Sequence, residues 1–184
     1  VGSDALDANT TADNNTAVGF SAMTSNTTGT SNTAIGRSAM STNTTGDCNV
    51  AIGQNALLQN TTGGLNVAVG RFALDNNTTA DNNNAVGYEA LGANTTGTGN
   101  VAVGTFSLLT STTGSYNAAL GREALKVNTT GFEQVALGNG SLIKNTTGAC
   151  NIGIGSSAGG DITTGTNNIA IGRDAGTDAV RDLE

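Results

Sequence analysis

The sequence predicts an all-β protein, a parallel β-solenoid built from coils of equal length. Two observations predict this fold. Glycine closes an Ala-Val-Gly, Ala-Ile-Gly or closely related triplet once every 17 residues, and Asn-Thr-Thr-Gly recurs with the same spacing. A fixed short period is the sequence signature of a repeat architecture. The recurring glycines are Gly2, Gly19, Gly36, Gly53, Gly70, Gly87, Gly104, Gly121, Gly138, Gly155 and Gly172.

The coils are too short for helices. Seventeen residues leave no room for a pair of helices with their turns, which excludes a helical solenoid. We expect about eleven coils with two short strands in each, one ending in Ala-Val-Gly and one around Ser21-Ala22-Met23. At the usual strand spacing the coils stack into a rod roughly 50 Å long. A single repeat domain covers residues 1–176, and residues 177–184 form a C-terminal tail whose Leu183-Glu184 is interpreted as a cloning remnant.

The aligned columns predict which side chains fill the rod. Val18 and Met23 begin columns of large apolar residues, and Ala17 and Ala22 begin columns of small ones. Side chains alternate between the two faces of a strand, so the Val18 and Ala17 columns point in opposite directions. We expect the large columns inside. The alanine columns would then lie outside as smooth apolar stripes that mark a contact surface between chains.

Asn-Thr-Thr-Gly is predicted to form the corner between coils. Gly allows positive φ, Asn tolerates the left-handed region and Thr hydroxyls bond to nearby backbone groups. Stacked copies of this corner would also allow asparagine amides to hydrogen-bond from coil to coil. A second asparagine column, beginning at Asn15, offers the same bonds at the strand entrance.

Four pentapeptides carry a resemblance to a known family. They are Asn32-Thr33-Ala34-Ile35-Gly36, Asn49-Val50-Ala51-Ile52-Gly53, Asn66-Val67-Ala68-Val69-Gly70 and Asn168-Ile169-Ala170-Ile171-Gly172. They resemble the Asn-Ser-Val-Ala-Ile-Gly repeats of YadA-like head domains in trimeric autotransporter adhesins, and similar repeats in bacteriophage tail fibres. The likeness extends from Gly2 to about Gly176, although the adhesin heads use a shorter period. It implies a left-handed β-roll, three chains side by side, and display on a cell or virion surface for attachment.

Composition narrows the function classes. The chain has no His and a net charge of −7, so histidine-based nucleophilic catalysis is unavailable and a phosphate backbone would be repelled. The sequence contains no run of 18 apolar residues, so we expect no membrane insertion by this segment. Glu89 and Glu123, two coils apart in one column, are best interpreted as part of a solvated face. Asp13-Asn14-Asn15 and Asp81-Asn82-Asn83 lack calcium-loop spacing. We therefore expect neither an enzyme nor a cofactor or metal site.

The cysteines are not expected to pair. Cys48 and Cys150 are 102 residues apart, six full periods, and so occupy one column. Six strand spacings place them ~29 Å apart, far beyond the reach of a disulfide.

The expected function is that of a structural or adhesive repeat domain, the head or shaft of an extracellular trimeric attachment fibre. Its partners would be two further copies of the chain and a host-surface glycan or protein receptor. Variable columns after the glycines supply a candidate contact ridge of Arg37, Arg71, Phe72, Tyr88, Phe106 and Arg122. Arg, Tyr and Phe are frequent contact residues in interfaces.

Ice binding is the alternative function. The paired threonines form regular columns, as on the ice-binding faces of antifreeze solenoids, although those faces usually carry Thr-x-Thr. The corresponding ladder comprises Thr27, Thr28, Thr44, Thr45, Thr61, Thr62, Thr95 and Thr96.

Overall fold

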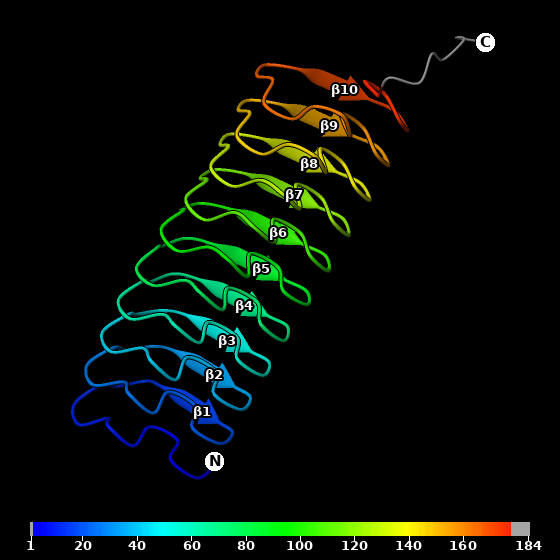
Figure 1. Ribbon diagram of the computed structural model, residues 1–184. Coiled ribbons are helices and arrows are strands. Elements are labelled where there is room, and N and C mark those ends of the chain that lie inside the picture. The colour runs from blue at the N-terminus through cyan, green and yellow to red at the C-terminus, as the bar shows by residue number, and fades with distance from the viewer. Residues whose placement is uncertain (1, 178–184) are drawn as a thin grey trace.

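The computed structural model describes residues 2–177 and shows a straight stack of flat coils (Figure 1). Each coil contributes one strand of three residues. The strands are β1 (Thr16–Val18), β2 (Thr33–Ile35), β3 (Val50–Ile52), β4 (Val67–Val69), β5 (Asn84–Val86), β6 (Val101–Val103), β7 (Ala118–Leu120), β8 (Val135–Leu137), β9 (Ile152–Ile154) and β10 (Ile169–Ile171). The predicted parallel β-solenoid is confirmed.

The strands form one sheet in chain order, and every neighbouring pair is parallel. Thr16 pairs with Thr33 and Thr33 with Val50, so each step of the sheet is one period of the sequence. Nine complete turns separate β1 from β10, fewer than the eleven coils expected, because the units before β1 and after β10 are incomplete. The expected tail at 177–184 lies outside the described residues, apart from Thr177.

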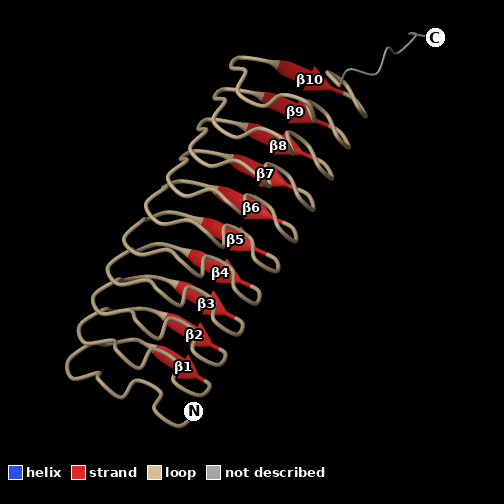
Figure 2. Cartoon of the chain, viewed as in Figure 1, coloured by secondary structure: helices blue, strands red, loops and turns tan. Residues whose placement is uncertain are grey.

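The expectation of a second strand in each coil is wrong. The segment around Ser21-Ala22-Met23 forms turns, because Ser21 and Met23 have φ values of 52° and 53° and are not extended. Coil-to-coil bonds persist there, as when the Met23 N–H donates to the Ala39 carbonyl at 3.0 Å. Figure 2 shows the result, a ribbon of strands on one side of the rod and loops elsewhere. We call the segment around Ser21-Ala22-Met23, together with its equivalents in the other coils, the turn side.

The assignment of the alanine columns to the outside is also wrong. Ala34 in β2 is fully buried, whereas Ile35 beside it is 39% exposed. Ala39 and Met40 of the turn side are fully buried in the same cluster. Because Met40 and its equivalents fill the interior from the turn side, the facing strand position has room only for a methyl group. The large Val18 column therefore points outward, while the predicted burial of the Met23 column is confirmed.

Asparagine ladders run inside the rod beside this apolar core. Asn43 donates Nδ2 to Asn26 Oδ1 at 2.8 Å and to the Gly46 carbonyl at 3.0 Å, and both asparagines are fully buried. In the second ladder the Asn32 N–H donates to Asn15 Oδ1 at 2.9 Å. The predicted coil-to-coil bonding of asparagine is confirmed in both columns. Each amide satisfies buried backbone or side-chain groups that would otherwise lack partners.

Close stacking explains why the strand-closing position is always glycine. Gly53 has φ +136°, and a Cβ there would lie 2.6 Å from the Gly70 carbonyl oxygen of the next coil. Such a contact is too short for any side chain. The two cysteines, Cys48 and Cys150, are both free.

Candidate functional site

Three aromatic side chains from successive coils meet on the turn side, near the middle of the rod. Tyr88 contacts Phe72 with ring centroids 6.3 Å apart and Phe106 at 5.4 Å, both edge to face. The Arg71 guanidinium lies 4.5 Å from the Phe72 centroid and 5.9 Å from that of Tyr88. We call Phe72, Tyr88 and Phe106 the aromatic row. Edge-to-face and cation–π contacts hold these rings in place.

Ion pairs extend this cluster beyond Phe106. Lys126 Nζ lies 5.5 Å from the Phe106 centroid and 3.2 Å from Glu123 Oε1. Arg122 reaches the same carboxylate at 3.0 Å. Glu123 is thus paired with two cations, and its side chain is only 18% exposed, less than its interpretation as part of a solvated face implies.

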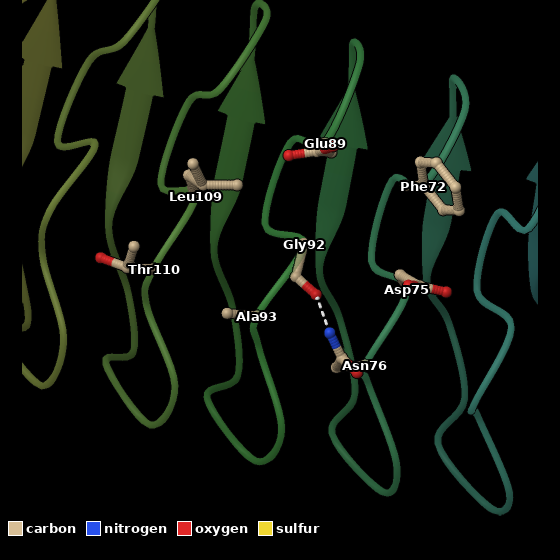
Figure 3. A pocket seen from close by; sticks show the side chains of 8 residues that line it. All are labelled: Phe72, Asp75, Asn76, Glu89, Gly92, Ala93, Leu109 and Thr110. Atoms are coloured by element: carbon tan, nitrogen blue, oxygen red, sulfur yellow. Dashed lines mark hydrogen bonds between the residues drawn. The ribbon is translucent and has the colours of Figure 1, made fainter.

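A pocket of about 410 Å³ opens beside the aromatic row. Three adjacent coils line it, and the close-up in Figure 3 shows their side chains around the hollow. The lining residues are Phe72, Asp75, Asn76, Glu89, Gly92, Ala93, Leu109 and Thr110.

The pocket exists because one coil has small residues where its neighbours have larger ones. Gly92 occupies the column of Asp75 and Leu109, and Ala93 occupies the column of Asn76 and Thr110. A Cβ at Gly92 would meet nothing closer than the Glu89 carbonyl at 3.4 Å. The hollow is therefore open space and is not required by backbone packing.

Two carboxylates give the pocket its electrostatic character. Burial, and secondarily the Glu89 charge, raises the pKa of the Asp75 carboxyl above its ordinary value. Asp75 Oδ1 is buried and has no hydrogen-bond partner among the described residues. Hydrogen bonding to Glu89, together with burial and the Glu89 charge, raises the pKa of the Tyr88 phenol. Two carboxylates thus lie together here, and neither forms a salt bridge among residues 2–177.

The structure brings together most of the candidate contact ridge. Arg71, Phe72, Tyr88 and Phe106 touch one another, and Arg122 joins through Glu123 and Lys126. Arg37 is exposed two coils before Arg71 and takes no part in this cluster. Sequence reasoning paired Glu89 with Glu123, whereas the structure places Glu89 beside Asp75.

Six pocket residues were not singled out from the sequence: Asp75, Asn76, Gly92, Ala93, Leu109 and Thr110. A signal for them was present. The dipeptide Gly92-Ala93 interrupts two columns that carry Leu58-Gln59, Asp75-Asn76 and Leu109-Thr110 in the neighbouring coils. A pair of small residues between larger ones in the adjacent coils indicates a surface hollow.

The paired threonines have two different environments. Thr27, Thr44, Thr61 and Thr95 donate their hydroxyls to the carbonyl of the equivalent residue one coil later, at 3.0 to 3.1 Å. Their neighbours Thr28, Thr45, Thr62 and Thr96 are exposed. The candidate ice-binding ladder is therefore a single solvent-facing rank.

The last residue of every strand lies on the outward side of the sheet and is apolar along the whole rod. Ile35, Ile52, Val103 and Leu120 are between 38 and 44% exposed. We call their column the aliphatic face; it comprises Val18, Ile35, Ile52, Val69, Val86, Val103, Leu120, Leu137, Ile154 and Ile171. It lies opposite the turn side, since the alanine core separates the two.

Among residues 2–177 no group of three or more Cys, Asp or Glu side chains is arranged to hold a metal ion. The same residues include no helix with the length and apolarity needed to cross a membrane.

Comparisons with protein-family models, curated proteins and solved structures give no match to this chain. What is shown is a parallel β-solenoid of 17-residue repeats; the likeness to adhesin heads stays a prediction.

Proposed function

We propose that this chain is a non-catalytic domain of an extracellular attachment fibre, its head or shaft, and that three copies pack side by side through their aliphatic faces. The observation that carries the proposal is the aliphatic face itself. Its side chains are exposed from Val18 to Ile171 except at Val69 and Leu137, which are half-buried. A contiguous apolar surface of this kind usually marks a site of contact with another protein.

The dimensions of the face set the size of the contact in such an assembly. Ten strands at ~4.8 Å, with an apolar width of roughly 10 Å, give on the order of 500 Å² per chain. Three copies around one axis would bury about 1,500 Å² in total, which is about 500 Å² for each pair of chains and smaller than a standard two-chain interface. The alanine columns, which the sequence suggested for this contact, are buried within each chain. Contact through the aliphatic face is also consistent with the resemblance to trimeric adhesin heads and phage fibres.

A fibre role also fits the mechanics of the rod. Each coil bonds only to its neighbours, so length can change by whole repeats without disturbing the rest of the fold. The asparagine and threonine ladders add side-chain bonds along the rod axis. Such a rod would hold a receptor-binding surface away from a cell or virion.

Charged substitutions on the aliphatic face test the proposal. Ile52→Lys would place a cation in the contact and should convert the trimer to monomers, as measured by light scattering. Thr45→Lys puts the same side chain on an exposed corner and should leave the mass unchanged. If both variants keep the mass of the unmodified chain, the aliphatic face is not the contact.

Ice binding is the second candidate, and the exposed rank of Thr28 and its equivalents favours it. The hydroxyls repeat at the coil spacing of ~4.8 Å. A single rank orders fewer waters than the paired ranks of a Thr-x-Thr face. Thermal hysteresis in a dilute sample, lost on Thr45→Lys and Thr62→Lys, would establish this function in place of attachment.

A further inference from the structure

The carboxylates of the pocket form no salt bridge among residues 2–177, in contrast to the equivalent position two coils later, and the nearby Arg71 guanidinium lies over the Phe72 and Tyr88 rings. Glu89 and Glu123 occupy one column with φ values of 53° and 59°. Glu123 pairs with Arg122 and Lys126, whereas within residues 2–177 neither Glu89 nor Asp75 has a salt bridge. Like charges beside each other in a half-buried site favour the arrival of a cation.

The other polar groups of the pocket leave few donors for a ligand. Asn76 Nδ2 is engaged with the Gly92 carbonyl at 2.7 Å, the bond drawn in Figure 3. The Thr110 hydroxyl is engaged with the carbonyls of Lys126 and Asn128 at 3.1 and 3.0 Å. A ligand therefore meets mainly acceptors, above all carboxylate oxygens, and must itself bring donors.

Shape and apolar walls restrict the ligand further. Phe72 and Leu109 stand on opposite sides of the coil that carries Gly92 (Figure 3). A pocket of about 410 Å³ is at the small end of the range for ligand sites and has room for one sugar ring. The apolar C–H faces of a sugar ring suit an aromatic wall, and its hydroxyls and amine supply donors.

We propose that this pocket binds a protonated amino sugar, whose ammonium group lies against the carboxylates of Glu89 and Asp75 and whose ring packs between Phe72 and Leu109. A bare divalent cation fits less well, because two carboxylates and apolar walls give too few oxygen ligands. The inference rests on the proposed attachment function, for which it names the receptor chemistry: a polysaccharide with free amines.

The experiment is a calorimetric titration of the full chain with a β-1,4-linked glucosamine tetramer. The fully N-acetylated tetramer is the matched ligand, since it keeps the rings and loses the charge. Binding of the first and not of the second is expected. Glu89→Gln should weaken binding about tenfold or more, as for loss of a hydrogen bond to a charged group. Gly92→Leu should abolish it, because Leu109 shows that this column accepts leucine.

Glu123→Gln is the control variant, because it removes the same charge from the same column two coils away. It should bind as the unmodified chain does. Equal binding of the N-acetylated tetramer, no binding of either ligand, or equal losses for Glu89→Gln and Glu123→Gln would each overturn the inference. Measuring the mass of the same samples separates the two proposals. A trimer that ignores the amino sugar overturns only this inference, and a monomer that binds it overturns only the trimer.

Discussion

The Asn60 side-chain amide donates to Asn43 Oδ1 across 2.7 Å, and the two residues are fully buried in neighbouring coils. Asn60 also donates to the Gly63 carbonyl at 2.8 Å, and its own Oδ1 accepts from Asn77 at 2.9 Å. One side chain thus satisfies buried groups in three coils. The ladder therefore links neighbouring coils through side-chain hydrogen bonds that are buried away from water.

Asn60→Ala should therefore be severely destabilising. It leaves Asn43 Oδ1 without its donor and removes the Asn60 acceptor of Asn77 Nδ2 in a buried site, at about 1 to 3 kcal/mol for each group. The Gly63 carbonyl keeps a second donor, Asn49 Nδ2 at 2.9 Å. We expect a loss of about 3 kcal/mol in the free energy of unfolding, measured with urea. Asn60→Ser should lose less, because Ser111 already occupies this column. Equal stability of Asn60→Ala and the unmodified chain would mean that the ladder contributes nothing.

Neighbouring alanines in β7 test which side of the sheet faces the core. Ala119 is fully buried and Ala118 points outward, where other coils carry Val. Ala119→Val should cost about 1 to 3 kcal/mol in the free energy of unfolding, because the core has no room for two methyl groups. Ala118→Val should change stability by less than about 0.5 kcal/mol. A larger loss for Ala118→Val than for Ala119→Val, measured as urea midpoints, would mean that the alanine column faces outward, as the sequence predicted.

Leu65 occupies a strained backbone position. Its φ is 59° and its side chain is 59% exposed, so the left-handed conformation is not offset by burial. Asn82, one coil later, adopts φ 61° in the same column. Leu65→Asn should stabilise the chain by roughly 1 kcal/mol, since Asn tolerates this region. The control is Leu58→Asn at a negative-φ position; a thermal midpoint raised equally in both variants would refute the explanation by strain.

Asp75→Asn should alter the pH dependence of stability. The raised pKa means that the folded state holds its proton more tightly than the unfolded chain, whose ordinary value is 3.8. Stability is therefore lost as pH rises from 3.8 through the folded-state pKa. The variant should be slightly more stable than the unmodified chain at pH 7, with the difference vanishing below pH 3.8. A difference in urea midpoint that is independent of pH would contradict this assignment.

Sequence periodicity predicted the solenoid and its asparagine ladders because every column repeats one environment. Asn43 and Asn60 must stack if their backbones stack. The repeat pattern does not indicate whether Ala17 or Val18 points inward, since both are apolar. Side-chain volume determines it, because Met23 and its equivalents fill the interior from the turn side and leave space only for alanine. The prediction of a second strand was wrong because φ is positive at Ser21 and Met23. Neither Ser nor Met favours positive φ, so the residue types gave no sign of this conformation.

The candidate site was predictable only in part. Arg71, Phe72, Tyr88 and Phe106 stood out as large side chains in variable columns, and stacking brought them into contact. The pocket depends on the absence of a side chain at Gly92 and on the carboxylate of Asp75 from the preceding coil. Gly92 and Asp75 lie in one column, whose residues vary in size and polarity, so the periodicity did not mark either position.

The mass of the unmodified chain by sedimentation equilibrium tests the central claim most directly. If the aliphatic face joins three copies, the mass should be about three times the 18.1 kDa of one chain. It should hold across dilution, because a long apolar contact favours a closed assembly. A mass of 18.1 kDa at every concentration would contradict the account, since the aliphatic face would then stand in water along the whole rod.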